Sequence, residues 1–562
     1  MLRMSLNKLF VLGSLAAFTG AVPAAWSDTI PVKIEVHADQ SEGTLKEIYR
    51  FFGADEPNYA YMKDGKKLLK HLGELHDEGP WFRAHNLMTT GPGAPALKWG
   101  STNMYTEDED GNPVYDWKIV DLIFDTYLEN GVRPYVEMGF MPEAMSTRPD
   151  PYMHEWRPGL PYNDIYTGWA YPPRDYEKWG ELCYQWAKHC VERYGKEEVE
   201  KWYWETWNEA NITYWKGTPE EFYKLHDYAI AGVLRALPTA RVGGPDTAGW
   251  GGDFARNFYE HNLRGTNYAT GETGSRLDFV SFHAKGSPRW QGDFIRMGIA
   301  AQLKEIDRGF GLIASFPELK DTPIIIGESD PEGCAACQGN DVSYRNGTMY
   351  SSYTAASFAR KHDLAARHGV NFEGALSWSF TFEDQAYFAG FRQMASNGID
   401  LPVLNVLRMF SMMDGERVAA ESSGQIPLDE ILEKGVRDQP DIGTLASTRD
   451  GRLAVMVWHY HDDDLPGPDA RVALDIDGFP SSVTTAVLTH YRVDFFHSNA
   501  YIEWQRMGSP VAPNERQYAQ LEEASKLATV ADPEKITLDQ GNAALKFELP
   551  RQGVSLLIFE WD

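Results

Sequence analysis

The feature that most constrains the fold is a repeated alternation of short apolar segments with longer amphipathic ones between about residues 45 and 410. The short segments have the character of buried strands, and the longer ones place apolar residues at helical spacing. In residues 116–130, for example, Ile119, Ile123 and Tyr127 recur every four residues. The eight expected strands cover residues 49–53, 81–86, 133–139, 202–209, 240–246, 277–283, 323–328 and 374–380.

Eight strands separated by helices predict a (β/α)8 TIM barrel. An open, doubly wound sheet is the alternative, but no glycine-rich phosphate turn follows the first strand. After about residue 412 the pattern changes to short alternating segments with turns, which predicts a C-terminal β-sandwich. Residues 32–37 also alternate and could join that sandwich from the N-terminal side.

The first 27 residues have the pattern of a secretory signal peptide. Arg3 and Lys8 give a basic start, an apolar run covers residues 9–22, and Ala25 and Ser27 place small residues before Asp28. We therefore expect cleavage near Ser27 and export to the periplasm or the extracellular space. The expected parts of the chain are a leader at 1–27, an N-terminal strand region at 28–44, a catalytic barrel at 45–411 and a sandwich at 412–562.

The net charge of −28 disfavours two classes of partner. A strongly acidic protein repels nucleic acid and anionic lipid, so we expect neither nucleic acid nor a membrane as a partner. No later segment has the 18 or so apolar residues of a membrane span.

The four cysteines form two pairs with different expectations. Cys183 and Cys190 lie on one helical face but about 10 Å apart, too far for a disulfide, so we expect buried thiols. Cys334 and Cys337 form a CxxC in a loop, where a local disulfide is favoured over free thiols. Because no second ligand pair accompanies them, we expect no metal and no cofactor.

Two glutamates end expected strands and carry the main functional hypothesis. Glu209 ends the aromatic segment 202–209, and Glu328 ends the apolar segment 323–328. Active sites of barrel enzymes lie at the carboxyl ends of the strands, and cleavage of a glycosidic bond needs two carboxyl groups facing each other. Either glutamate alone could be a hydrogen-bonded structural acid. Glu205 is expected to support the site, and Glu332 is the alternative nucleophile if its strand ends later.

Six motifs occur in one order along the chain and together resemble glycoside hydrolase family 39, nearest to its bacterial β-xylosidases. The similarity extends over almost everything after the leader. The motifs are Phe-Arg-Ala-His-Asn-Leu at 82–87, Gly-Val-Arg-Pro-Tyr-Val-Glu-Met-Gly-Phe-Met-Pro at 131–142, Pro-Pro-Arg-Asp-Tyr-Glu-Lys-Trp at 172–179, Trp-Asn-Glu-Ala-Asn at 207–211, Val-Gly-Gly-Pro at 242–245 and Asp-Phe-Val-Ser-Phe-His at 278–283.

The resemblance implies a retaining hydrolase in which Glu209 is the acid/base and Glu328 the nucleophile. Their carboxyl groups are then expected about 5–5.5 Å apart. Asn208 would donate to the sugar 2-hydroxyl. The two histidines, His85 and His283, would contact the sugar or orient Glu328, with a purely structural role as the alternative. Trp378 would form the sugar platform at the end of the eighth strand.

Departures from the family pattern fall in loops that select the substrate. Ala210 replaces a proline, Gly327-Glu328-Ser329-Asp330 replaces a Thr-Glu-aromatic-Asn pattern, and residues 331–339 look different. We expect an exo-acting β-xylosidase on xylo-oligosaccharides, with an α-L-arabinofuranosidase or another exo-glycosidase as the alternative. A carbohydrate-binding protein without turnover is the alternative from another class. The oligomeric state stays open.

Overall fold

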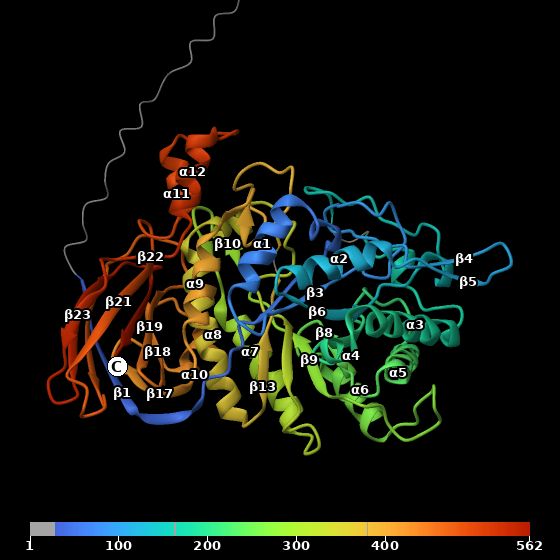
Figure 1. Cartoon of the computed structure of the whole chain (residues 1–562), viewed down its shortest axis with the longest axis horizontal. Helices are drawn as coiled ribbons and strands as arrows, with labels where there is room; N and C mark the ends of the chain where they lie inside the picture. Colours follow the sequence, from blue (N-terminus) through green and yellow to red (C-terminus); the bar gives the residue numbers. More distant parts are fainter. Residues whose placement is uncertain (1–28, 162–164, 379) are drawn as a thin grey trace, which may run out of the picture.

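The computed structural model of the protein describes residues 29–161, 165–378 and 380–562. The expected leader at 1–27 lies outside these residues. Within the described ranges, no helix combines the length and the apolar character that a bilayer crossing requires. Figure 1 shows a barrel and a β-rich region side by side, with α8 (Thr348–His368) and α9 (Pro402–Ser411) between them.

The predicted (β/α)8 barrel is confirmed. Parallel pairing runs from β13 through each strand in turn to β2, and β14 closes the circle by pairing with β2. The eighth strand is therefore split in two, with Leu376 between the halves. The barrel strands are β2 (Phe51–Ala54), β3 (Trp81–Ala84), β6 (Arg133–Met138), β7 (Tyr203–Thr206), β8 (Arg241–Thr247), β9 (Phe279–His283), β12 (Ile324–Glu328), β13 (Phe372–Ala375) and β14 (Ser377–Trp378).

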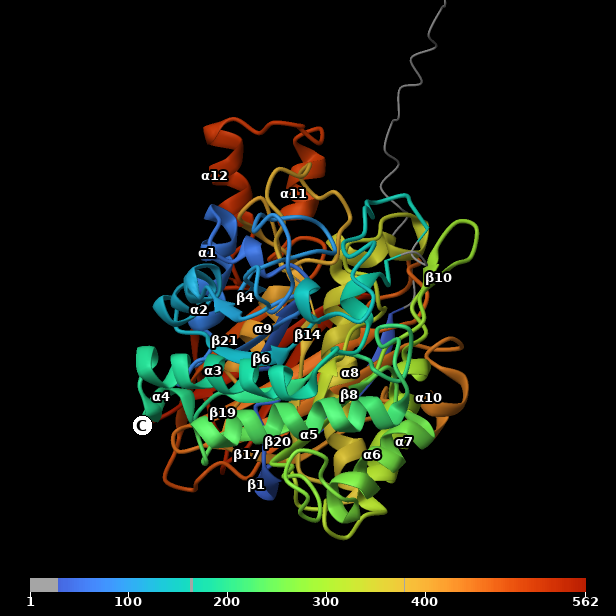
Figure 2. The ribbon, with the colours of Figure 1, turned by 90° about the vertical axis from the view of Figure 1, so that its right-hand side faces the viewer.

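Helices cover the outside of the barrel, and two of them begin with side-chain caps. Asp175 accepts hydrogen bonds from the first amides of α3, and Thr218 forms a capping box with Glu221 at the start of α5. Figure 2 shows α3, α5 and α6 along one side. Besides α8 and α9, the α-helices around the barrel are α1 (Lys63–Gly73), α2 (Lys118–Glu129), α3 (Tyr176–Tyr194), α4 (Lys196–Val199), α5 (Pro219–Ala236), α6 (Gly252–Arg264) and α7 (Ile299–Ala314).

The C-terminal strands form one mixed sheet that includes the N-terminal strand β1. This strand pairs in parallel with β20 and antiparallel with β17. Apolar residues of β1, β19, β20 and β25 share one core, so the two halves of the sheet face each other as a sandwich. The strands are β1 (Ile30–Thr44), β17 (Glu416–Ser422), β18 (Asp441–Arg449), β19 (Arg452–Tyr460), β20 (Ala470–Asp477), β21 (Thr485–Val493), β22 (Ala528–Thr529), β23 (Glu534–Thr537), β24 (Ala543–Leu549) and β25 (Val554–Glu560).

The opposite face of this sheet packs on the barrel. Trp458 of β19 and Leu556 of β25 belong to the same buried cluster as Phe358 of α8 and Phe410 of α9. A helical pair, α11 (Ala500–Arg506) and α12 (Glu515–Ala524), projects from the sheet beside the loop after β14, where Tyr518 donates to the carbonyl of Asn397. The remaining elements are α10 (Leu428–Lys434) and three short hairpins, β4 (Tyr105–Glu107) with β5 (Pro113–Tyr115), β10 (Arg289–Trp290) with β11 (Ile295–Arg296), and β15 (Ala395–Ser396) with β16 (Ile399–Asp400).

Candidate active site

All six residues that the sequence singles out lie at one end of the barrel, where the strands finish. Glu209, however, does not end its strand. Trp207 has a φ of 70°, which turns the chain out of the sheet after Thr206, and Glu209 itself is left-handed with a φ of 46°. The six are His85 after β3, Asn208 and Glu209 after β7, His283 at the end of β9, Glu328 at the end of β12 and Trp378 at the end of β14.

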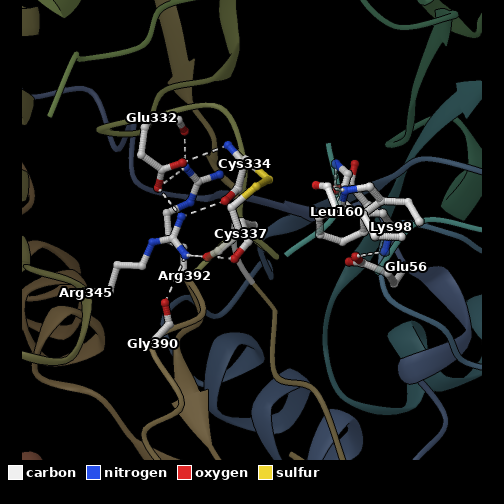
Figure 3. The surroundings of a disulfide bond; sticks show 12 residues. Glu56, Lys98, Leu160, Glu332, Cys334, Cys337, Arg345, Gly390 and Arg392 are labelled. Carbon is white, nitrogen blue, oxygen red and sulfur yellow. Dashed lines mark hydrogen bonds and ion pairs between the residues drawn. A yellow bond between two sulfur atoms is a disulfide. The ribbon is translucent and has the colours of Figure 1, made fainter. Parts of the chain in front are cut away.

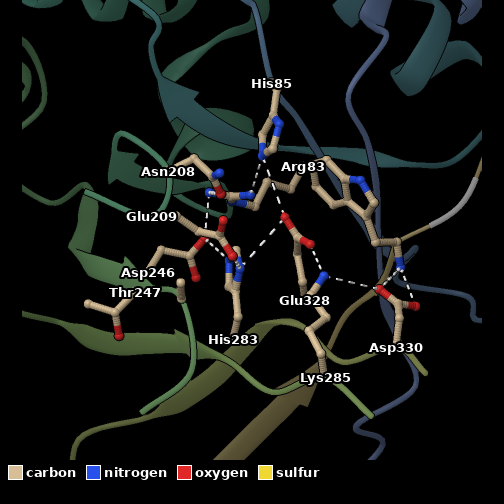
Figure 4. A network of polar contacts seen from close by, with 12 residues as sticks. Arg83, His85, Asn208, Glu209, Asp246, Thr247, His283, Lys285, Glu328 and Asp330 are labelled. Carbon is tan, nitrogen blue, oxygen red and sulfur yellow. Dashed lines mark hydrogen bonds and ion pairs between the residues drawn. The ribbon is translucent and has the colours of Figure 1, made fainter. Parts of the chain in front are cut away.

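Glu209 and Glu328 meet at one nitrogen of His283. Nδ1 of His283 lies 2.8 Å from Oε1 of Glu209 and 3.7 Å from Oε1 of Glu328. The distance between the two oxygens is therefore at most the sum of these two values. This maximum equals the shortest separation of about 6.5 Å found between the carboxyl groups of inverting enzymes. Figure 4 shows the two carboxyl groups on either side of the imidazole.

Glu328 is held as a carboxylate. Burial favours its protonated form, but the charges of Lys285 and His283 hold the pKa of this carboxyl at about 2. Nζ of Lys285 contacts Oε2 of Glu328 and lies 3.9 Å from Oδ2 of Asp330. A buried but ionised carboxylate at a strand end is suited to nucleophilic attack.

His283 is a buried imidazolium between two carboxyl groups. Burial opposes its charge, but Asp246 and Glu328 raise its pKa to about 10. Both ring nitrogens therefore carry protons. Nε2 donates to Oδ2 of Asp246 at 2.6 Å, and Nδ1 donates to Oε1 of Glu209 at 2.8 Å. Asp246 thereby fixes the ring that positions Glu209.

Arg83 lies beneath the site as the central buried cation. Its guanidinium contacts Oε2 of Glu205 at 2.7 Å, Oε2 of Glu137 at 2.9 Å and Oδ2 of Asp246 at 2.5 Å. Burial raises the pKa of Glu137 well above its usual range and that of Glu205 to about 7. Glu205 also accepts from the hydroxyl of Tyr135 at 2.9 Å, in agreement with the supporting role that its position in the strand predicts.

The side-chain oxygen of Asn208 is hydrogen-bonded within the protein, whereas its side-chain nitrogen is available to a ligand. Its Oδ1 accepts from Arg83 at 3.2 Å, which fixes the orientation of the amide. Among the described residues, none accepts a hydrogen bond from Nδ2, although the side chain is almost fully buried. A buried donor without a protein partner is suited to a substrate hydroxyl.

His85 and Trp378 form another wall of the site. Burial lowers the pKa of His85 and keeps the ring neutral. Its Nδ1 donates to Oδ1 of Asp55 at 2.8 Å, and its Nε2 accepts from Arg83 at 3.2 Å. The rings of His85 and Trp378 lie 4.3 Å apart, and the backbone amide of Trp378 donates to Asp330.

A pocket of about 410 Å³ opens above these residues. Glu209, Glu328 and Trp378 line it, together with aromatic and aliphatic side chains that include Tyr166 and Tyr214. The predicted sugar platform and the two glutamates therefore face one cavity. Within the described ranges, no cluster of His, Cys, Asp and Glu side chains has the arrangement of a metal site.

The loop after Glu328 is closed by the disulfide Cys334–Cys337, as the CxxC spacing favours. Cys334 lines the pocket. Figure 3 shows a charged cluster of Glu332, Arg345 and Arg392 beside this loop. Glu332 is paired with Arg345 and Arg392 at 2.9 Å each. Since β12 ends at Glu328, Glu332 belongs to this charged cluster and not to the carboxyl pair.

Cys183 and Cys190 are buried free thiols in α3.

Charged residues of the site that the sequence does not single out include Lys285, Asp246 and Arg83. Asp246 directly follows the motif at 242–245, Lys285 lies two residues after the motif at 278–283, and Arg83 lies inside Phe-Arg-Ala-His. An arginine inside an apolar strand is the signal that could have revealed the buried cluster, because such a cation needs buried carboxylates around it.

Comparisons with known proteins agree with this geometry. Residues 32–539 match the family model described as Glycosyl hydrolases family 39. A β-xylosidase of Caldicellulosiruptor saccharolyticus is 25% identical over 433 residues, which are 75% of this chain and 78% of that protein. An α-L-iduronidase of Mus musculus is 27% identical over 387 residues, 61% of this chain and 56% of that protein. The solved structure of a bacterial orthologue of human α-L-iduronidase superposes with a TM-score of 0.75 at 19% identity, covering 95% of this chain and 84% of that one.

Proposed function

Since this chain belongs to glycosyl hydrolases family 39 and is a glycosidase, we propose that it is an exo-acting, retaining β-xylosidase of xylo-oligosaccharides. The observation that carries the proposal is the shared contact of Glu209 and Glu328 with one nitrogen of His283. This spacing supports a retaining pair, because the two oxygens lie at or below the shortest separation of about 6.5 Å that inverting pairs use.

In the proposed mechanism, Glu328 attacks the anomeric carbon while Glu209 protonates the departing oxygen. The resulting covalent glycosyl–enzyme is then hydrolysed by a water molecule that Glu209 deprotonates. Lys285 and His283 keep Glu328 ionised before the attack. Nδ2 of Asn208 donates to the sugar 2-hydroxyl, an interaction that strengthens towards the transition state.

The charges around the pocket support a neutral sugar as the substrate. Five carboxylic side chains line it against three cationic ones, and this excess disfavours a substrate that carries its own carboxylate. The β-xylosidase relative supports the same choice. A uronoside is the second candidate, because the mouse relative is an α-L-iduronidase and the three cations could pair with a uronate.

The test is turnover of a panel of aryl glycosides: β-xyloside, α-L-arabinofuranoside, β-glucoside, β-galactoside and α-L-iduronide. We expect the xyloside to have the highest kcat/KM and Glu328→Gln to abolish its turnover. Asp341→Asn, which makes the same change on an exposed pocket residue, should retain most of the activity. Preference for the iduronide would replace the xylose assignment, and full activity of Glu328→Gln would remove Glu328 as the nucleophile.

Two further measurements examine the mechanism. The sugar released first should have the anomeric configuration of the substrate, observed by proton NMR before mutarotation; inversion would contradict the mechanism. In Glu209→Ala, substrates with good leaving groups should be less impaired in the first step, because they need little protonation. Equal impairment for good and poor leaving groups would argue against Glu209 as the acid.

We also propose that the protein is exported through the leader at 1–27. The disulfide between Cys334 and Cys337 supports an oxidising compartment. Mass spectrometry of the secreted protein should find its N-terminus near Asp28. A protein retained in the cytoplasm with residues 1–27 intact would contradict the proposal.

A further inference from the structure

A second charged pair lies in the pocket beside the two glutamates. Asp55 directly follows β2 and Lys98 lies in the loop after β3, and both line the cavity that contains Glu209 and Glu328. Nζ of Lys98 contacts Oδ2 of Asp55, and each side chain is only 4% exposed. Burying two charges costs desolvation energy that their attraction does not reliably offset, so the pair is weak evidence for a purely stabilising role.

The backbone of Lys98 is held in a strained position by two other side chains. Its φ is 58°, in the left-handed region that a lysine rarely adopts. Its amide donates to Oε1 of Glu56 at 2.6 Å, and its carbonyl accepts from Nε2 of His154 at 3.0 Å. Figure 3 draws Lys98 and Glu56 in one view with the disulfide loop that lines the same pocket. Strain that the surrounding structure maintains in this way is typical of functional sites.

The pair is one imidazole ring away from the proposed nucleophile. His85 contacts Oδ1 of Asp55 through Nδ1 at 2.8 Å, and its Nε2 lies 3.7 Å from Oε1 of Glu328. A sugar whose anomeric carbon lies at Glu328 would extend over His85 towards Asp55 and Lys98. Asn208 is already assigned to the 2-hydroxyl, which leaves the hydroxyls at carbons 3 and 4 for this end of the pocket.

We propose that Asp55 and Lys98 bind the 3- and 4-hydroxyls of the sugar whose glycosidic bond is cleaved, an inference that rests on the proposed function above. A carboxylate accepts from one hydroxyl of a vicinal pair while an ammonium donates to the other. Hydrogen bonds to charged groups are the stronger ones, so these two side chains select sugars with both hydroxyls free.

The same contact accounts for exo action. A further sugar linked to the 4-oxygen would have to occupy the space of the buried pair. The enzyme would therefore accept only the residue at the non-reducing end of an oligosaccharide. Asp55 and Lys98 act as the end wall of the pocket.

The experiment compares aryl xylosides with their 3-deoxy and 4-deoxy analogues, using kcat/KM. In the wild type we expect each deletion to reduce kcat/KM by about 10- to 100-fold, because it removes one hydrogen bond to a charged group. In Lys98→Met and in Asp55→Asn, the xyloside should be slower, whereas removing the hydroxyl that each residue binds should cause little further loss. Arg289→Met, which removes a cation elsewhere on the pocket wall, should discriminate between these substrates as the wild type does.

Equal kcat/KM of the wild type on the xyloside and on both deoxy analogues would overturn the proposal, even if neither variant folds. Folded variants that are slow but discriminate as the wild type does would also overturn it. If the aryl-glycoside panel identifies another sugar, the deoxy analogues of that sugar are used instead. Failure of the xylose assignment and failure of the Asp55–Lys98 contact are then separate results.

Discussion

At the residue scale, the charge of Glu328 depends on its neighbours. Burial alone would favour the protonated carboxyl, and Lys285 is foremost among the cations that hold its pKa at about 2. Replacing Lys285 with Met should raise the pKa of Glu328 by about 1–3 pH units. Because only the ionised carboxylate attacks, the acid limb of the kcat/KM profile should move to higher pH by the same amount. The measurement is the pH dependence of kcat/KM.

Lys285→Arg is the matched control, since it retains the positive charge. Its acid limb should stay near that of the wild type, while its kcat can change through altered geometry. An acid limb in Lys285→Met at the wild-type pH would show that Lys285 does not set the charge of Glu328. A loss of activity that is independent of pH would point to a role in packing alone.

At the element scale, α8 contains a buried lysine at the junction of barrel and sandwich. Lys361 is fully buried, and its ammonium donates to Oγ of Ser357 at 3.3 Å. Burial lowers its pKa from 10.5 to about 7. The unfolded chain therefore binds a proton more tightly than the folded protein does, and this residue reduces stability most below pH 7. The loss of stability decreases as the pH rises from about 7 to 10.5, because the folded lysine is then neutral and the unfolded lysine gradually loses its own proton.

Lys361→Met should stabilise the protein at pH 6 by on the order of 5 kcal/mol, the free-energy equivalent of this pKa shift. The gain should shrink towards pH 10, where the wild-type lysine is neutral when folded and has begun to lose its proton when unfolded. Urea unfolding of both proteins at pH 6, 8 and 10 measures this difference. A gain that is the same at all three pH values would indicate better packing by methionine and not the removal of a charge.

At the scale of the whole molecule, the sandwich and the barrel are joined by a buried ion pair. Nη2 of Arg360 in α8 contacts Oδ1 of Asp441 in β18 at 2.8 Å, and both side chains are at most 2% exposed. Without Arg360, the buried Asp441 carboxylate keeps hydrogen bonds from the amide of Ile426 and from Nε1 of Trp458 but loses its partner cation. Arg360→Met should therefore destabilise the protein by about 3–5 kcal/mol, as measured by thermal unfolding, with kcat/KM at 25 °C unchanged.

A second pair across the same boundary provides the control. Arg367 contacts Asp429 at 2.7 Å, but the aspartate is 85% exposed. Arg367→Met should cost at most about 1 kcal/mol, because water replaces the lost partner. Equal losses of stability for the two variants would show that burial does not decide the strength of these contacts.

The sequence predicts the barrel well because its signals are local. Each barrel strand is a short apolar segment that ends near a polar residue, and Val120, Ile123 and Tyr127, at helical spacing, form the buried face of α2. Local patterns also favour the disulfide, since three residues separate its cysteines. The predicted strand at 202–209 ends three residues later than β7 does. The aromatic run continues through Trp207, but the positive φ of Trp207 turns the chain away from the sheet.

Contacts between distant residues could not be predicted in this way. Asp55 meets Lys98, and His283 meets both Glu209 and Glu328, only because the closed barrel brings the ends of different strands to one pocket. Nor does the sequence give the charge of Glu328, which depends on burial and on the cations around it. The sequence by itself determined the strands, the types of the site residues and their order. Tertiary structure alone decided which of them touch and which are ionised, because distance and desolvation are properties of the folded chain.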